Sequence, residues 1–268
     1  MTKTILITGA TDGLGHATAT HLAKQGHALL LHGRNVKKLA ITAEELRALP
    51  GVGVIGTVRG DLSDLDDVAK MAEGLLAEQG GIDVLINNAG VLKADSATTA
   101  RGEDLRFVVN TFAPALLSRL LLPAIPAEGR LVHLSSAAQA PVDLAAMAGE
   151  RPLEAMEAYA QSKLALTMWS AALARELGPD GPVTVAVNPG SLLATKMVKQ
   201  GFGVAGNDIG IGADILSRAA LSADFAEASG LYFDNDSGRF AAPHSAAADK
   251  TKAAAVVAAI EKRIAEYL

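Results

Sequence analysis

The chain alternates short, wholly apolar segments with longer segments that are apolar on one side only. The short segments, rich in Val, Ile and Leu, predict buried β-strands at residues 3–8, 28–32, 52–58, 82–86, 130–136, 183–187 and 230–233. Helical patterns occupy residues 13–25, 36–49, 65–78, 101–122, 155–177, 195–203, 212–224 and 249–267, whereas residues 137–154, with two Pro and a Gly, fit no single helix. This alternation predicts an α/β fold, a Rossmann-type doubly wound parallel sheet with helices on both faces.

Composition and charge narrow the class of protein. The 268 residues suit one large domain, and no linker-like stretch divides them, so we expect a single domain over residues 1–268. The net charge of −5, without a long Lys or Arg run, argues against nucleic acid or a polybasic membrane patch as partner and favours a small molecule.

We also expect the chain to lack the residues and segments that disulfide-bonded, metal-binding, secreted and membrane proteins need. The chain has no Cys, and its six His residues lack paired-ligand spacing, so we expect no disulfide and no metal site. The first strand begins almost at residue 1, which leaves no room for a cleaved signal peptide, and no apolar run looks long enough to span a bilayer. A soluble, cytoplasmic protein is the natural expectation.

A glycine-rich turn follows the first predicted strand and precedes the first predicted helix. It contains Gly9, Thr11, Asp12, Gly13, Leu14 and Gly15. Glycines at such a turn allow a tight bend and let the backbone approach a pyrophosphate, which the helix N-terminus then stabilises. The turn therefore indicates a dinucleotide site, although an ordinary connection between strand and helix would have the same pattern.

The end of the second strand suggests which dinucleotide binds. A dinucleotide fold meets the adenosine ribose there, and an acidic residue would bond a free 2′-hydroxyl. The chain has Arg34 instead, whose guanidinium can pair with a 2′-phosphate, so NADP is favoured and NAD stays an alternative. Asp12 argues the other way, because a carboxylate near that phosphate repels it, and Arg34 could also be a solvated loop charge.

Polar and small residues follow the later strands as well. Asp61, before Leu62, can accept from an adenine amino group or can cap the next helix. Asn88, Ala89 and Gly90 end the fourth strand, where they either let a cofactor lie close or only form a turn. Pro189 and Gly190 end the sixth strand and suggest a backbone turn beside the cofactor, followed by a mobile flap.

Four further residues could carry chemistry. Tyr159 and Lys163 lie four residues apart in a predicted helix and so share one face. An ammonium beside a phenol favours the phenolate, which makes the pair a candidate for acid/base catalysis. A surface Tyr and a solvated Lys without a catalytic role would have the same spacing. Ser136 ends the fifth strand, where ligands bind in open α/β sheets, and Asn110 interrupts an apolar helical run and needs hydrogen-bond partners.

In their order, these motifs resemble short-chain dehydrogenases/reductases over nearly the whole chain. The resemblance rests on Thr8-Gly9-x-x-x-Gly13-x-Gly15, Asn87-Asn88-Ala89-Gly90, Asn110, Ser136, Tyr159-x-x-x-Lys163 and Asn188-Pro189-Gly190. The three-residue gap between the first two glycines is similar to the single-domain branch. The long interval from Ser136 to Tyr159, and Ser229-Gly230-x-Tyr232-Phe233, are similar to the retinol-dehydrogenase-like group.

The resemblance implies an NAD(P)(H)-dependent oxidoreductase that interconverts an alcohol and a ketone or aldehyde by hydride transfer. Tyr159 would be the general acid/base, Lys163 would lower its pKa and hold the nicotinamide ribose, and Ser136 would bond the substrate oxygen. Asn110 would hold a water that links Lys163 to solvent. The implied cofactor contacts are Gly9, Thr11, Asp12, Gly13, Leu14, Gly15, Arg34, Asp61, Leu62, Asn88, Ala89, Gly90, Tyr159, Lys163, Pro189, Gly190 and Thr195.

Some implications of the resemblance are weaker than others. Thr195 stands one residue further from Pro189-Gly190 than in the family pattern, which leaves its nicotinamide contact open. The family resemblance alone suggests a homo-oligomer. The Ala-, Leu-, Met- and Gly-rich segments 137–154 and 196–211 suggest an apolar substrate body. The competing hypothesis is a dinucleotide-binding sensor or scaffold of the same fold without turnover.

Overall fold

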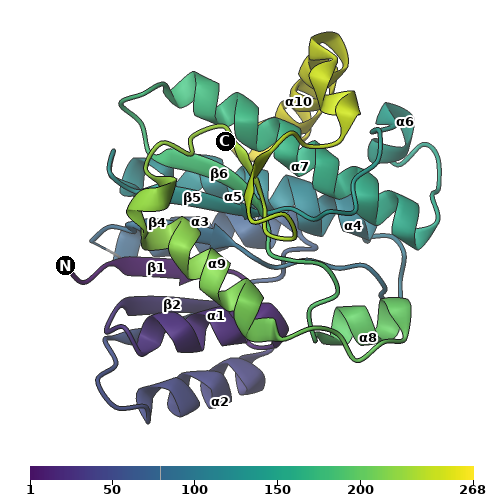
Figure 1. Cartoon of the computed structure of the whole chain (residues 1–268). Coiled ribbons are helices and arrows are strands. Elements are labelled where there is room, and N and C mark those ends of the chain that lie inside the picture. The colour runs from purple at the N-terminus through teal and green to yellow at the C-terminus, as the bar shows by residue number, and fades with distance from the viewer. Residues whose placement is uncertain (79) are drawn as a thin grey trace.

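The computed structural model describes residues 1–78 and 80–268, and in this part of the chain one sheet of eight strands runs through the molecule (Figure 1). The strand order is β3-β2-β1-β4-β5-β6-β7-β8. The strands are β1 (Thr4–Ile7), β2 (Ala28–Gly33), β3 (Ile55–Arg59), β4 (Val84–Asn87), β5 (Arg130–Leu134), β6 (Val183–Asn188), β7 (Tyr232–Asp234) and β8 (Arg239–Ala241). Strands β1 to β7 pair in parallel, and β8 pairs antiparallel with β7.

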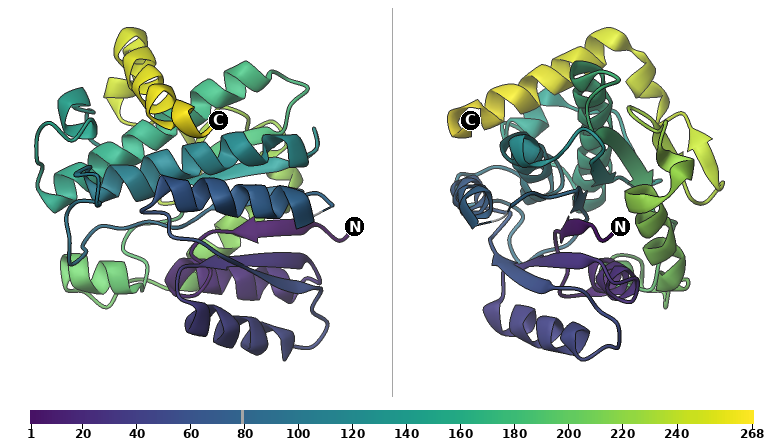
Figure 2. Two further views of the ribbon diagram at one scale, coloured as in Figure 1. Left: turned by 180° about the vertical axis from the view of Figure 1, so that it is seen from behind. Right: turned by 90° about the vertical axis from the view of Figure 1, so that its left-hand side faces the viewer.

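Alternate strand residues form two separate cores, one on each face of the sheet. Leu6, Leu30, Leu85 and Leu131 face helices α3 (Leu65–Glu78), α5 (Ala113–Leu121) and α7 (Ala155–Leu177). The neighbouring strand residues, Ile5 and Ile7 among them, face α1 (Gly13–Ala23), α2 (Val36–Arg47) and α9 (Ile209–Leu221). Figure 2 shows these two helical layers from behind and from the side. The predicted doubly wound, Rossmann-type α/β fold is confirmed.

The helix expected at residues 101–122 begins later and is not uniform. It comprises α4 (Leu105–Phe107), a π-helical turn (Val108–Phe112) and α5. The predicted start at 101 is wrong because Asp104 caps the helix by accepting from Arg106 N and pairs with Thr98 in an isolated bridge. Pro114 explains the π turn, since it has no N–H to bond the carbonyl of Asn110 four residues earlier.

The length and hydropathy of this helical segment meet the criteria for a membrane-spanning helix. Residues Leu105–Ala124 are long and apolar enough to cross a bilayer, with a mean hydropathy of 1.4 in the most apolar window, of which 72% is buried. The expectation that no segment has the length to span a membrane is therefore wrong by length and composition. The burial is that of a helix packed inside a protein core.

The structure has short elements that the sequence pattern did not predict. Strand β8 is one of them, and α6 (Leu144–Met147) is a short helix within the irregular segment 137–154. Helix α10 (Lys250–Ile264) lies across the outer side of α7 (Figures 1 and 2). Its Val256, Ile260 and Ile264 join the core of α3, α5 and α7. Glu261 accepts hydrogen bonds from Arg119 and, at 2.7 Å, from Trp169 Nε1.

We predict that Ile260→Ala lowers the free energy of unfolding by about 2 to 5 kcal/mol, because a fully buried side chain leaves a cavity. Urea unfolding followed by circular dichroism measures the loss. The control Lys262→Ala removes an exposed side chain two residues away and is expected to change stability by less than about 0.5 kcal/mol. Equal effects of the two substitutions would show that α10 is not part of the cooperative core.

Candidate active site

The predicted site residues meet at one edge of the sheet, where the parallel strands end. Gly9 to Gly15 follow β1, Arg34 follows β2, Asn88 to Gly90 follow β4, Ser136 follows β5, and Pro189 follows β6. Asp61 and Leu62 follow β3. Between β1 and β4 the strand order reverses direction, and such a switch point is where open α/β sheets bind ligands.

The glycine turn is shaped by close backbone packing. Gly9 has φ +67, and a Cβ there would lie 3.1 Å from Ala89 Cα. A Cβ on Gly15 would lie 2.3 Å from the carbonyl oxygen of Gly9, so only glycine fits. Asp12 caps α1 by accepting from Gly13 N at 2.9 Å, and Lys196 donates to its other carboxylate oxygen. Burial raises the pKa of Asp12, but the Lys196 and Gly13 contacts outweigh it and leave the pKa below its usual value.

His32 holds this turn in place, and sequence reasoning missed its role. Its Nδ1 accepts from Gly9 N at 3.2 Å, and its Nε2 lies 3.1 Å from the carbonyl oxygen of Gly60. The ring thus joins the ends of β1, β2 and β3 as a neutral imidazole with the proton on Nε2. Burial lowers the pKa of His32, which keeps this neutral form. A lone His at the end of an apolar strand gave no signal of these contacts.

The turn after β4 has features that fit a dinucleotide. Asn88 Nδ2 donates to the carbonyl oxygen of Thr8 at 2.8 Å. Asn88 Oδ1 is buried and, within residues 1–78 and 80–268, has no hydrogen-bond partner, as expected of a group that awaits a ligand donor. A Cβ on Gly90 would lie 3.4 Å from Lys163 Nζ, so this glycine places the backbone of the turn close to the Lys163 amine. Asn88, Gly90 and the N-terminus of α1 are therefore the groups that would hold a dinucleotide here.

The adenosine end of the site is only partly defined by side chains. Arg34 is exposed directly after β2, and its charge acts on Asp61. Asp61 Oδ1 accepts from the Ser63 backbone N–H and hydroxyl, whereas Asp64, which directly precedes α3, accepts from Asp66 N. The cap at the start of α3 is thus Asp64 and not Asp61. Leu62 is buried in the core, as is Leu14, so either could reach a cofactor only through its backbone.

Asn110 ties three elements together in the middle of the π turn. The side chain is fully buried. Its Oδ1 accepts from Val91 N at 2.8 Å, and its Nδ2 donates to the carbonyl oxygen of Val91 and to Ser162 Oγ, both at 3.0 Å. Ser162 Oγ in turn donates to the carbonyl oxygen of Tyr159 at 2.7 Å. The amide therefore positions α7 against the turn after β4.

Tyr159 and Lys163 lie on one face of α7, as their spacing predicts. Lys163 Nζ is 5.7 Å from the centre of the Tyr159 ring and donates to the carbonyl oxygen of Leu134, at the end of β5, at 2.7 Å. The Ser136 side chain lies close enough to the Tyr159 phenol to lower its pKa. The three predicted groups therefore meet, and a carbonyl or alcohol oxygen beside them could exchange a proton.

The electrostatics of the pair differ from the simple expectation. Burial raises the pKa of Tyr159, and the neighbouring Ser136 side chain opposes only part of this rise. Burial likewise lowers the pKa of Lys163 to about 7. The sequence suggests an ammonium that lowers the pKa of the phenol, whereas here loss of hydration dominates both groups.

Two residues outside the predicted set hold Ser136. Tyr232, on β7, donates its hydroxyl hydrogen to the carbonyl oxygen of Ser136 at 3.1 Å. Gln139 Nε2 donates to the same oxygen at 2.8 Å, and Gln139 Oε1 accepts from His244 N at 2.8 Å. Tyr232 belongs to the Ser-Gly-x-Tyr-Phe pattern, so the motif was visible in the sequence although this contact was not.

The additional residue between Pro189-Gly190 and Thr195 is taken up locally. Leu192 has φ 52, in the left-handed region, and Ser191 is bonded through its backbone N–H and hydroxyl to Asp236 in the β7–β8 turn. Thr195 caps α8 (Lys196–Phe202), its hydroxyl accepting from Val198 N at 3.2 Å. A Cβ on Gly13 would lie 3.5 Å from Thr195 Cγ2, so Thr195 borders the glycine turn.

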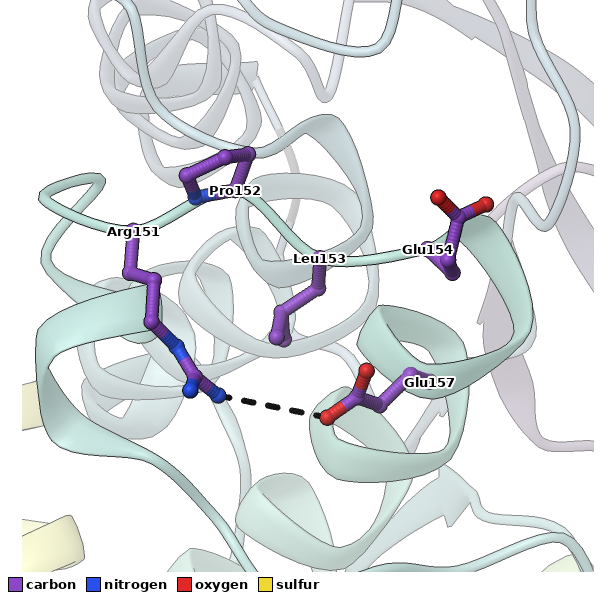
Figure 3. Close-up of a pocket in the computed structure, with 5 residues that line it drawn as sticks. All are labelled: Arg151, Pro152, Leu153, Glu154 and Glu157. Carbon is purple, nitrogen blue, oxygen red and sulfur yellow. Dashed lines mark ion pairs between the residues drawn. The ribbon is translucent and has the colours of Figure 1, made fainter.

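A pocket of roughly 310 Å³ lies at the start of α7 (Figure 3). Arg151, Pro152, Leu153, Glu154 and Glu157 line it, and Arg151 lies 2.7 Å from Asp143 and 4.0 Å from Glu157. Neither Ser136 nor Tyr159 is among its lining residues. The pair with Glu157 connects the irregular segment 137–154 to the helix that carries Tyr159, whereas the pair with Asp143 lies within the segment.

With this geometry in place, comparison with known proteins defines the class. The chain belongs to the short-chain dehydrogenase family, whose model matches residues 3–202. It is similar to retinol dehydrogenase 11 of Homo sapiens, at 36% identity over 71% of this chain and 61% of that protein. It is also similar to retinol dehydrogenase 12 of Bos taurus, at 35% identity over 75% and 64%. The resemblance noted in the sequence is confirmed, and the chain spans less than two thirds of the length of both relatives.

Solved structures have the same fold. An uncharacterized protein of Mycobacterium paratuberculosis superposes with a TM-score of 0.79 at 29% identity, covering 98% of this chain and 93% of that one. The landomycin C-6 ketoreductase LanV, solved with NADP and rabelomycin, superposes with a TM-score of 0.68 at 28% identity, covering 87% and 94%.

The depressed pKa of Lys163 predicts how stability depends on pH. Between about pH 7 and its usual pKa near 10.5, the unfolded chain carries this proton and the folded chain does not, so stability rises with pH over that window. We expect Lys163→Met to reduce the slope of unfolding free energy between about pH 7.5 and 9.5 by up to about 1.4 kcal/mol per pH unit. The buried His32 and His133 have lowered pKa values and contribute only below this window. Urea unfolding at three pH values gives both slopes, and identical slopes would mean that Lys163 keeps its ordinary pKa.

Proposed function

We propose that the chain is an NADP(H)-dependent oxidoreductase that interconverts an alcohol and a ketone or aldehyde. The observation that carries the proposal is the meeting of Ser136, Tyr159 and Lys163 at the edge of the sheet where the glycine turn also lies. Family membership supports the same reaction class. When bound, the nicotinamide cofactor would supply or accept the hydride.

The chain's own residues would move the proton. In reduction, the Tyr159 hydroxyl donates its proton to the carbonyl oxygen while the Ser136 hydroxyl donates a hydrogen bond to the same atom. In oxidation the phenolate takes the proton back. Lys163, when charged, stabilises that phenolate, and its Nζ also lies beside Gly90, where it can donate to a ribose hydroxyl.

Asn110 would connect Lys163 to solvent through a water. Its side-chain amide is already bonded to Val91 and Ser162. The backbone carbonyl is therefore the better candidate to hold the water, because Pro114 cannot donate to it. This would give the proton a route between Lys163 and bulk water.

For the substrate, we propose an alcohol or carbonyl compound with an apolar body. Leu144 and Met156, in the segment 137–157 that joins Ser136 to the start of the Tyr159 helix, are exposed apolar side chains. The names of the similar retinol dehydrogenases and the rabelomycin in LanV are consistent with this class. Three further expectations stay predictions: that residues 1–268 form one domain, that the protein is cytoplasmic, and that it self-associates.

Replacing Tyr159 tests the chemistry. We expect Tyr159→Phe to lose about 10²- to 10⁴-fold in turnover, because the proton donor is gone, while NADPH affinity changes less than about twofold. NADPH consumption against a panel of retinal-like, aliphatic and aromatic aldehydes, steroid ketones and quinones measures turnover. Tyr267→Phe removes the same hydroxyl near the C-terminus and is expected to behave as wild type. Normal turnover in Tyr159→Phe would refute the assigned role, and binding without turnover by wild type across the panel would favour the sensor hypothesis.

Replacing Arg34 tests the choice of cofactor. We expect the wild-type chain to bind NADPH more tightly than NADH, and Arg34→Ala to weaken NADPH binding by about tenfold with little effect on NADH, since the guanidinium pairs only with the 2′-phosphate. Titration of reduced-nicotinamide fluorescence gives both dissociation constants. Arg175→Ala, an exposed arginine near the far end of α7, serves as the charge control. Equal wild-type affinity for the two cofactors would contradict the NADP assignment.

A further inference from the structure

Asp12 is an unexpected charge for an NADP site. It caps α1 at the turn where a dinucleotide pyrophosphate would bind. Its neighbour Thr11 packs against Gly33, where a Cβ would lie 2.7 Å from Thr11 Cγ2, so the turn adjoins the end of β2 that carries Arg34. Lys38, on α2, also acts on the Asp12 carboxylate. The carboxylate therefore lies near the end of β2, where a 2′-phosphate would lie, and on its own it would repel that phosphate.

Lys196 neutralises this carboxylate from a segment far away in the sequence. It is the first residue of α8, and its Nζ donates to Asp12 Oδ2. At the other end of α8, Lys93 Nζ donates to the carbonyl oxygen of Gln200 at 3.1 Å. A Cβ on Gly201 would lie 2.7 Å from Leu92 Cδ2. Helix α8 is therefore seated at both ends, on the glycine turn and on the segment after β4.

The Lys196–Asp12 ion pair is exposed to solvent, which bears on whether it stabilises the fold or affects a ligand. The side chains of Lys196 and Asp12 are 68% and 47% exposed. Pairs this exposed contribute little to stability because water screens them. A charged ligand beside the pair would still respond to whether Asp12 is neutralised, since an unpaired carboxylate presents a full negative charge at short range.

We propose that Lys196 is a positioning residue for cofactor choice: by pairing with Asp12 it removes the repulsion that would otherwise exclude the 2′-phosphate of NADP. This rests on the proposed function and adds a dependence on α8, because Lys196 reaches Asp12 only when α8 is seated on the glycine turn. Arg34 attracts the phosphate, and Lys196 cancels the opposing charge.

The test measures binding constants and needs no substrate. Lys196→Met keeps the length of the side chain and exposes the Asp12 charge, so the dissociation constant of NADPH is expected to rise about fivefold and that of NADH less than twofold, because only NADPH carries the additional phosphate. Lys199→Met removes an exposed lysine from the same helix and is expected to change the ratio of the two constants by less than about 1.5-fold. The difference is expected to shrink as ionic strength rises from about 0.05 to 0.5 M.

A double variant distinguishes two roles of Lys196: neutralising the Asp12 carboxylate, and contacting the 2′-phosphate directly. Asp12→Asn keeps a good helix cap, and combined with Lys196→Met it is expected to return the NADPH to NADH ratio to within about twofold of wild type. If the ratio stays low in the double variant, Lys196 touches the phosphate itself and the proposal is overturned. Equal weakening of both cofactors by Lys196→Met also overturns it but leaves the proposed function intact. Failure of the wild-type chain to bind either cofactor would overturn both.

Discussion

The buried amide of Asn110 is the contact on which the arrangement of this site depends. A primary amide with no exposed surface must satisfy its polar atoms inside the protein, and each one left unpaired would cost about 1 to 3 kcal/mol. Val91 and Ser162 satisfy them, and these partners belong to the turn after β4 and to α7. Because the π turn places Asn110 between these elements, α7 is fixed with Tyr159 and Lys163 toward the ends of the strands.

Neutralised charge is a second feature shared by the groups around the site. His32 is neutral because burial opposes its protonation, and in that form it can accept from Gly9 and donate to Gly60. Lys163 is so far removed from water that its pKa lies about 7, within reach of physiological proton exchange. Asp12 is paired with Lys196. A dinucleotide brings its own negative charge, so the pairing of the Asp12 carboxylate is the part of this pattern that suits the site to it.

The fold, and the meeting of the candidate site residues at one edge of the sheet, could be predicted from the sequence because they depend on local patterns. Apolar runs of strand length, helical periodicity and the strand-to-helix glycine turn each act within a few residues. What could not be predicted depends on contacts distant in the chain. His32 bonds Gly60 across 28 residues, Tyr232 holds Ser136 across 96, and Lys196 reaches Asp12 across 184.

Other differences arise from competing local effects. The helix expected from residue 101 begins at Leu105 because Asp104 caps it, and an acidic residue that starts a helix is hard to distinguish from one inside its first turn. The π turn could have been suspected from Pro114, which removes the donor for Asn110. The pKa directions of Tyr159 and Lys163 needed the structure, since burial outweighs the attraction that their spacing suggests.

The most direct test of the account follows the hydride itself. The protein would be incubated with NADPH carrying deuterium at the transferable C4 position, together with apolar aldehydes and ketones, and the products analysed by mass spectrometry. The account predicts an alcohol with one deuterium on the carbinol carbon, formed in step with oxidation of the cofactor. Oxidation of NADPH without deuterium in any alcohol would contradict it, because the hydride would then not pass to a carbonyl carbon at this site.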